Sequence, residues 1–353
     1  MNAGLLDVAV GPSSMAPPRR NPALDGLRGL AVLLVILSHT VDPNFEPMGA
    51  IGVTIFFVLS GYLITTLLLE ERGATGRIDR RRFYSRRAWR LLPALAILLS
   101  AEVAWRLAAG VTLSPVAIAA SYGTNIAMAM GVDVSTLGHT WSLSLEEQFY
   151  LLWPLALPFV MRRNPVATIV FAAAVSGLAR VAISVLAPWP VSFFSPATRA
   201  DAILVGCALA VALRQEPRPS RLGLFAGLAA TLLTLSCLTV GVPAAIALIA
   251  PASLATALLI ARLTATSGGV FGTVLGWSPL RYTGRISYGL YLWHPLMLSM
   301  AHVHRFPVVV FTLVSTFAVA SISWHAVEHP ILRLRLHQGR RMARTVPATA
   351  GGP

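Results

Sequence analysis

The sequence predicts an all-α fold, a polytopic membrane helix bundle with about ten transmembrane helices. Hydrophobic residues make up 56% of the 353 residues and charged residues only 12%, whereas soluble domains carry about 25% charged residues. The mean hydropathy is +0.69. Runs of about 20 mostly apolar residues, the length that crosses a bilayer, recur from near the N-terminus to near the C-terminus. Composition and run length therefore exclude an ordinary soluble enzyme.

The candidate spans follow from these apolar runs. They are 27–41, 50–69, 91–109, 143–161, 165–187, 201–213, 222–240, 242–262, 286–301 and 308–327. A further apolar stretch, 114–131, carries Pro115, Ser121 and Asn125. Irregular, polar backbone is tolerated at membrane depth only where protein or water surrounds it, so we expect this stretch to be a re-entrant or interfacial piece.

The distribution of the Arg residues between the loops indicates how the chain is oriented in the membrane. The chain has a net charge of +14, and every basic residue is Arg, a balance that in a soluble protein would suggest nucleic acid as a partner. Most Arg residues fall in the loops on the side of the N-terminus, however, and the opposite loops hold only Arg199 and Arg305. This positive-inside pattern predicts N-in and C-in orientation. The expected environment is the bilayer of the cell inner (plasma) membrane, with no nucleic-acid partner.

One membrane domain accounts for most of the chain. Residues 1–23 are rich in Pro, Ser and Gly and lack the apolar core of a signal peptide, so they are interpreted as a disordered cytoplasmic leader. The membrane domain covers 24–335, and 336–353 form a basic, disordered cytoplasmic tail. Cys207 and Cys237 fall within apolar runs, where a thiol behaves as a small hydrophobe. We predict no metal site.

The first apolar run contains Arg28 and His39 with ten residues between them. At 100° per residue, eleven steps return to within about 20° of the same helix face, about 16 Å further along the axis. An ionisable residue in a membrane span is costly and usually faces a cavity or a protein partner. The pair is therefore a candidate functional site.

The segment before the third run concentrates Arg residues. Arg86, Arg87 and Arg90 lie next to Phe83, Tyr84 and Trp89. Guanidinium groups bind phosphate oxygens bidentately, and aromatic or guanidinium planes stack on bases. We expect this cytoplasmic loop to bind a phosphorylated cofactor. The other reading, charges that set topology and attract anionic lipid, is favoured for Arg80, Arg81 and Arg82.

Further polar candidates lie inside or at the ends of later runs. Glu146 and Glu147 in HTWSLSLEEQFYLLWP point about 100° apart, so at least one should meet Arg or His within the bundle, either to tune a general base or as a structural ion pair. Arg199 and Asp201 suggest a salt bridge or a polar-substrate contact at the external mouth of a span. The predicted substrate-binding residues are Tyr62, Trp141, Ser142, Arg199, Asp201, Tyr291 and His294.

In their order along the chain, these segments resemble the acyltransferase 3 family of integral-membrane acyltransferases. The carriers of the resemblance are Arg28 with His39, FFVLSGYLI, the pair Arg87 and Arg90, WSLSLEEQFYLLWP, RADAILVG, GRISYGLYLWH and VEHP. Together they cover about residues 22 to 335.

The resemblance implies transfer of an acyl group, often acetyl, from acyl-CoA to a hydroxyl of a sugar, polysaccharide, lipid or antibiotic intermediate. It implies that His39 is the essential histidine, with Arg28 as its partner and Arg87 and Arg90 at the cytoplasmic acyl-CoA entrance. His39 then acts either as a general base or through an acyl-histidine relay, since both need the same residue. Arg28 or a neighbouring donor would stabilise the oxyanion.

Two alternatives stay open from sequence. A macrolide-type antibiotic hydroxyl is an acceptor for the same chemistry. A proton-coupled secondary transporter would use Arg28, His39 and the two glutamates as a pathway, although the inverted repeats typical of such proteins are not visible.

Overall fold

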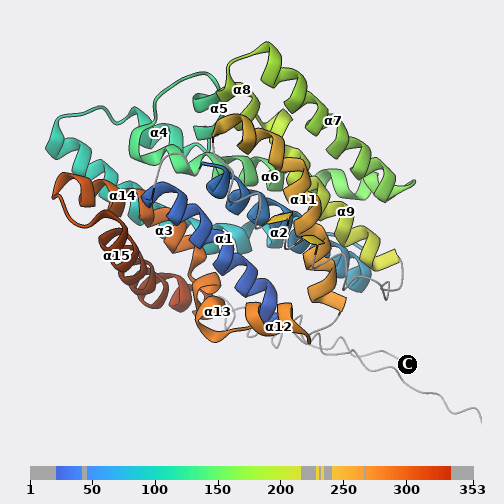
Figure 1. The fold of residues 1–353 in the computed structure, drawn as a ribbon. Helices are drawn as coiled ribbons and strands as arrows, with labels where there is room; N and C mark the ends of the chain where they lie inside the picture. Colours follow the sequence, from blue (N-terminus) through green and yellow to red (C-terminus); the bar gives the residue numbers. More distant parts are fainter. Residues whose placement is uncertain are drawn as a thin grey trace, which may run out of the picture.

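The computed structural model describes residues 21–41, 46–215, 228–229, 232–233, 241–265 and 268–334, and within these ranges every regular element is a helix (Figure 1). The predicted run 222–240 lies almost wholly outside the described residues, as do the predicted tail and most of the predicted leader. Helix α1 begins at Pro22 with Asn21 as its N-cap.

The described helices match most of the apolar runs. They are α1 Pro22–Thr40, α2 Glu46–Thr75, α3 Arg80–Ala109, α4 Ser114–Ala120, α5 Thr124–Ala129, η2 Ser135–Thr140, α6 Trp141–Val160, α7 Pro165–Leu186, α8 Trp189–Phe194, α9 Pro196–Gln215, α11 Val242–Ala265, α12 Val270–Leu275, α13 Ser278–Arg285, α14 Ser287–Val303, α15 Val308–Ser323 and the π-helical turn η3 Trp324–Glu328.

Seven helices of the described part are long and apolar enough to cross a membrane. They are Pro22–Thr40, Pro47–Thr75, Arg80–Ala109, Pro165–Leu186, Trp189–Gln215, Ile246–Ala265 and Val308–Leu334. Two further predicted spans form helices outside this group. Helix α6 is continuous, but its sequence contains the polar residues Glu146, Glu147 and Gln148, and α14 has only 17 residues. The chain is thus a polytopic helical bundle, and the total of ten spans stays a prediction.

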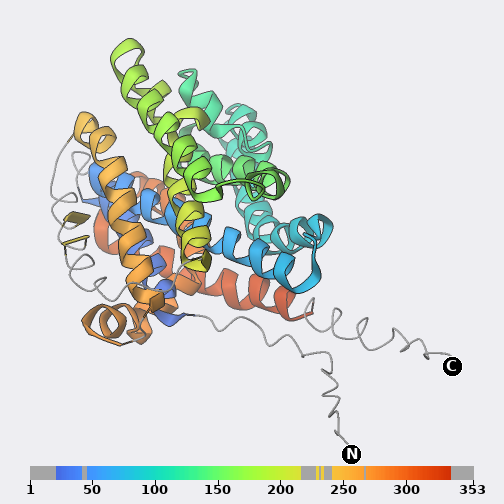
Figure 2. The same ribbon diagram turned by 90° about the vertical axis from the view of Figure 1, so that its right-hand side faces the viewer.

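Helix α2 lies at the centre of the bundle, in contact with α1, α9 and α11. Its closest approach is to α9, where a Cβ added at Gly61 would collide with the carbonyl oxygen of Ile203 and one at Gly206 with that of Val58. Small residues let helix backbones approach closely in membranes. Figure 2 shows this central packing from the side, and α7 and α15 lie at opposite edges in Figure 1.

The Arg-rich segment is helical, which corrects the expectation of a loop. Helix α3 begins at Arg80, and the side chain of Asp79 caps it by accepting a hydrogen bond from the backbone of Arg82. Sequence hydropathy missed this start because the first turns of α3 are charged. Arg87 and Arg90 therefore lie on a rigid helix, about 10 Å and 15 Å from its first residue.

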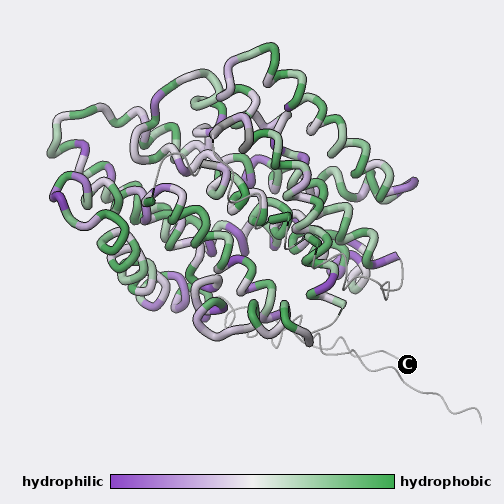
Figure 3. The backbone as a smooth tube through the Cα atoms, in the orientation of Figure 1, coloured by the Kyte–Doolittle hydropathy of each residue, from purple (hydrophilic) through white to green (hydrophobic). Residues whose placement is uncertain are grey.

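The stretch 114–131 forms α4 and α5, of seven and six residues, both too short to span a bilayer. Helix α4 contacts α3 and η2, while α5 contacts α6 and α8. The chain then turns through η2 into α6. In Figure 3 the long helices are largely hydrophobic, and hydrophilic residues gather at helix ends and in the turns between them.

Candidate functional site

A cavity of about 500 Å³ lies where α1, α2, η2, α6, α8 and α14 meet. Its described lining residues are Val35, Ser38, His39, Gly49, Ala50, Val53, Met128, Ser135, Thr136, Gly138, His139, Trp141, Trp189, Phe193, Phe194, Tyr291, Pro295 and Leu298. Such a volume suits a small ligand, and a mainly apolar wall with a few convergent polar groups is typical of a binding site.

His39 presents its imidazole to this cavity from the last turn of α1. Its Nδ1 lies 2.8 Å from the carbonyl oxygen of Val35. Because a carbonyl only accepts, Nδ1 carries the proton, and the lone pair is on Nε2. The His39 side chain is exposed. An accessible Nε2 with a free lone pair is what a general base or a nucleophile requires.

Two more histidines gather beside His39. The ring of His294 lies 5.2 Å from that of His39 and 5.5 Å from that of His139, measured between centroids. His139 lies 3.1 Å through Nδ1 from the carbonyl oxygen of Thr136, to which it donates. Burial lowers the pKa of His139 to about 4, so this imidazole is neutral at pH 7.

Tyr291 fixes the corner between η2 and α6. Its hydroxyl donates to the carbonyl oxygen of His139 at 2.6 Å and lies 2.6 Å from the hydroxyl of Ser142. Since the single phenolic proton is used on His139, Ser142 is the donor of the second bond. Tyr291 thus holds His139 in place. Both of its hydrogen bonds are made within the protein.

Arg199 lies behind the aromatic wall of the cavity. Its side chain is fully buried, and its guanidinium carbon is 5.5 Å from the rings of Phe57 and Trp141 and 5.1 Å from that of Phe193. None of its three side-chain nitrogens makes a hydrogen bond within the described residues. The aromatic faces stabilise the cation, but Arg199 does not line the cavity.

The two glutamates connect α6 to α3 and α2. Arg87 donates to Glu147 at 2.5 Å and lies over the ring of Tyr150 at 3.5 Å. Ser60, halfway along α2, donates to Glu146 at 2.7 Å. Both carboxylates therefore have partners inside the bundle, and Glu146 is one helical turn, about 6 Å, from Ser142.

Arg28 does not reach His39. Helix α1 is continuous between them, which keeps their Cα atoms about 16 Å apart. The Arg28 guanidinium instead donates to Ser287 at 3.5 Å, and its charge acts on Glu146. The predicted shared helix face is present, but this geometry gives no support to Arg28 as an oxyanion donor beside His39.

The remaining predicted site residues do not line the His39 cavity. Arg86 is exposed and 3.7 Å from Glu71, and Arg90 is exposed further along α3. Tyr62 packs against the hydrophobic core. Asp201 pairs with Arg180 of α7 at 2.6 Å, so the suggested bridge between Asp201 and Arg199 is not formed.

Sequence reasoning missed His139 and Arg180. His139 stands directly before the WSLSLEEQ motif, and its place at the entry of a polar span was an available signal. Arg180 is an isolated Arg within an apolar run, the same signal that singled out Arg28. No group of three or more His, Cys, Asp or Glu in the described part of the chain is arranged to hold a metal ion.

Known proteins share this sequence pattern. The family model described as "Acyltransferase domain" matches residues 21–326. The chain is 34% identical over 351 residues to YrhL of Bacillus subtilis (strain 168), named as a peptidoglycan O-acetyltransferase, with 88% of this chain and 54% of YrhL covered.

Two further relatives carry the name OatA. The chain is 30% identical over 363 residues to the O-acetyltransferase OatA of Staphylococcus aureus (strain NCTC 8325 / PS 47), covering 90% of this chain and 58% of OatA. It is also 30% identical to the peptidoglycan O-acetyltransferase OatA of Listeria monocytogenes, covering 88% of this chain and 55% of the relative.

The chain spans little more than half the length of these relatives. No solved structure matches it. The family match covers most of the chain and agrees with the helical membrane bundle, so the chain belongs to the acyltransferase 3 family of membrane acyltransferases.

Proposed function

We propose that this protein transfers an acyl group, in the first instance acetyl, from acyl-CoA to a hydroxyl of a cell-wall or surface glycan, with His39 at the centre of the reaction. The observation that carries this proposal is the exposed imidazole of His39, protonated at Nδ1, in a cavity shared with His139 and Tyr291. The glycan acceptor follows from the names of YrhL and of the Listeria OatA.

In the proposed reaction, Nε2 of His39 accepts the proton of the acceptor hydroxyl as that oxygen attacks the thioester carbonyl carbon. The tetrahedral intermediate collapses, the carbon–sulfur bond breaks, and the CoA thiolate leaves and takes the proton from His39. General-base catalysis of this kind contributes about 10²- to 10⁴-fold. The hydrogen bond from Nδ1 to Val35 keeps the imidazole in the required tautomer.

We place the entrance for the acyl donor on the cytoplasmic side of the bundle. Arg86, Arg87 and Arg90 lie on the first turns of α3, where guanidinium groups suit the phosphates of acyl-CoA. Arg87 pairs with Glu147 of α6, and one turn before Glu146 on the same helix Ser142 is bonded to Tyr291, which lines the cavity. Helix α6 therefore links the proposed donor entrance to the His39 cavity, which supports transfer from a cytoplasmic thioester to an acceptor in the outer half of the bundle.

The test is acyl transfer by the purified chain in proteoliposomes, with radiolabelled acetyl-CoA and fragments of cell-wall glycan. We expect label on the glycan as an alkali-labile ester. Hydrolysis of acetyl-CoA that is unaffected by any glycan acceptor would contradict the proposal. Label on the protein when the acceptor is withheld would identify the relay through an acyl-histidine rather than direct transfer.

A further inference from the structure

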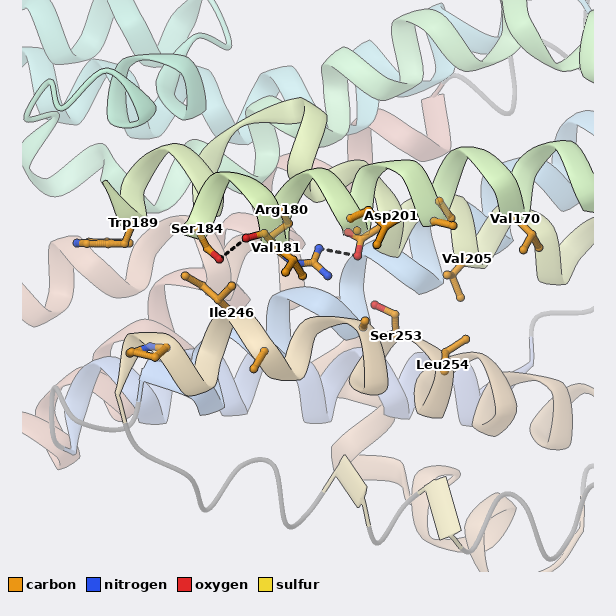
Figure 4. Close-up of a pocket in the computed structure, with 17 residues that line it drawn as sticks. Val170, Arg180, Val181, Ser184, Trp189, Asp201, Val205, Ile246, Ser253 and Leu254 are labelled. Atoms are coloured by element: carbon orange, nitrogen blue, oxygen red, sulfur yellow. Dashed lines mark hydrogen bonds and ion pairs between the residues drawn. The ribbon is translucent and has the colours of Figure 1, made fainter. Parts of the chain in front are cut away.

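A second cavity, of about 910 Å³, lies between α7, α9 and α11, away from His39 (Figure 4). Most of its wall is small or aliphatic. The described lining residues are Val170, Ala173, Ala174, Gly177, Leu178, Arg180, Val181, Ser184, Trp189, Asp201, Val205, Pro243, Ile246, Ala247, Ala250, Ser253 and Leu254. We call this cavity the α7–α11 groove.

The groove opens toward the bilayer. Leu178 and Val181 on its rim are 70% and 59% exposed, although they lie on a helix apolar enough to span a membrane. In the membrane these side chains face hydrocarbon. A lipid chain can therefore enter the groove sideways, without passing through water.

A buried ion pair interrupts this apolar wall. Arg180 donates to Asp201 at 2.6 Å and to the carbonyl oxygen of Thr198 at 2.9 Å, and Figure 4 shows its guanidinium pointing across to Asp201. Nε of Arg180 and Oδ1 of Asp201 make no hydrogen bond within the described residues. Unmet polar atoms beside a buried pair are costly.

The charges around this pair do not cancel. Arg199 is fully buried, and both Arg180 and Asp201 lie close enough for their charges to act on it. Two guanidinium groups and one carboxylate leave a net charge of +1. In the described part of the chain, the only ion pair that either arginine makes is the one with Asp201. A surplus positive charge in a low-dielectric environment attracts an anion strongly.

The length of the groove between Arg180 and its far end matches the hydrocarbon thickness of one leaflet of a bilayer. From Arg180 to Val170, at the far end of the groove, the rise along α7 is about 15 Å, which is half of the ~30 Å hydrocarbon thickness. On the other side of Arg180, Ser184 and Trp189 line the groove toward the end of α7. Trp189 also lines the His39 cavity.

We propose that the α7–α11 groove binds an anionic phospholipid of the bilayer. One hydrocarbon chain lies along the groove from Arg180 to Val170, and the phosphate lies at the guanidinium of Arg180. With the N-terminus inside, α7 runs outward, so the lipid belongs to the outer leaflet. This site is separate from the chemistry at His39 and does not depend on the proposed reaction.

Native mass spectrometry of the full chain tests the proposal, using dioleoyl phosphatidylglycerol and dioleoyl phosphatidylcholine as probes. We expect one phosphatidylglycerol to be retained per protein, at least tenfold in preference to phosphatidylcholine. Ala174→Trp, which fills the groove, should abolish retention. Ala172→Trp, on an exposed face of the same helix outside the groove, is the matched control and should bind as the parent does.

Arg180→Gln should lose the preference for phosphatidylglycerol. This change breaks a buried ion pair and can impair folding. The Ala174 and Ala172 variants leave that pair intact and therefore test separately where the lipid binds. Equal retention of both lipids by the parent chain would contradict the preference for an anionic headgroup. Undiminished retention by Ala174→Trp would show that the lipid does not bind in the α7–α11 groove. His39→Asn should retain the lipid normally, whatever its effect on acyl transfer.

Discussion

The imidazole ring of His39 lies 5.2 Å from that of His294, with the two planes inclined by 44°. These residues come from α1 and α14, at opposite ends of the chain. Their contact, together with that between His139 and His294, means that the cavity exists only when α1, η2 and α14 are packed together. The proposed chemistry therefore depends on the tertiary packing of the whole bundle.

Replacing Tyr291 by Phe tests whether the hydrogen bonds of Tyr291 to His139 and Ser142 hold the residues of the His39 cavity in place. The change removes two hydrogen bonds of 2.6 Å, each contributing about 0.5–1.5 kcal/mol. We expect kcat to fall about tenfold while KM for acyl-CoA stays constant, because the proposed donor entrance is at Arg87 and not at Tyr291. Tyr282→Phe, which removes a hydroxyl bonded to Ser321, is the control. Equal effects of the two variants would argue against a positioning role.

Acid should destabilise the protein through His139. Burial lowers the pKa of His139 from 6.5 to about 4. Between these values the unfolded state binds more protons than the folded state, so the stabilising contribution is full above about pH 6.5 and is lost as the pH falls toward 4. The apparent melting temperature in detergent should drop less between pH 7.5 and 5 in His139→Asn than in the parent. Identical drops would contradict this assignment.

Arg87 and Glu147 should be energetically coupled. Their side chains are 20% and 19% exposed, so the pair is partly buried, and removing one partner leaves an uncompensated charge. We expect Arg87→Met and Glu147→Gln each to lower stability by about 2 kcal/mol, and the double variant to lose about 1–2 kcal/mol less than their sum. Unfolding in denaturant measures all three. Additive losses would show that the contact contributes little.

Arg87→Met should also raise KM for acyl-CoA if this end of α3 is the donor entrance. Glu147→Gln is the matched comparison, because it breaks the same pair but keeps the guanidinium. We expect a rise of at least fivefold in KM for Arg87→Met alone. Equal KM values in the two variants would remove Arg87 from donor binding and leave it a structural role.

Gly61→Val should prevent close packing of α2 against α9. A Cβ at Gly61 collides with the backbone of Ile203, which cannot move aside as a flexible side chain would. Overpacking in such a position costs about 1–3 kcal/mol or more, and the melting temperature in detergent should fall accordingly. Gly268→Ala, at a position with no neighbour within 4 Å, should leave it unchanged. An unaltered melting temperature for Gly61→Val would contradict the packing.

Much of the fold could be predicted from apolar runs, since spans must be long and apolar whatever their neighbours. The start of α3 could not be predicted from apolar runs, because residues 80–90 are rich in Arg and the helix begins at the cap formed by Asp79. Helix periodicity placed Arg28 and His39 on one face, but no rule of spacing could show that His39 contacts His294 rather than Arg28.

For buried charged residues, the sequence predicted the type of partner but not which residue it is. The expectation that a glutamate of α6 meets Arg or His within the bundle agrees with the contact between Glu147 and Arg87. For Asp201 the nearest charged residue in sequence, Arg199, suggested the wrong partner, because Arg180 approaches from α7. Arg199 and Asp201 are only two residues apart and project from different sides of α9, so the partner of Asp201 had to come from a neighbouring helix, and only packing decides which one.

The most direct test of the central claim is acyl transfer by His39→Asn in proteoliposomes with saturating labelled acetyl-CoA. Asparagine keeps a donor for the carbonyl oxygen of Val35 but removes the basic Nε2, and His302→Asn, at the exposed end of α14, is the matched control. We expect a loss of at least 10²-fold in kcat for His39→Asn and parental activity for His302→Asn. Parental activity in His39→Asn would contradict the central claim.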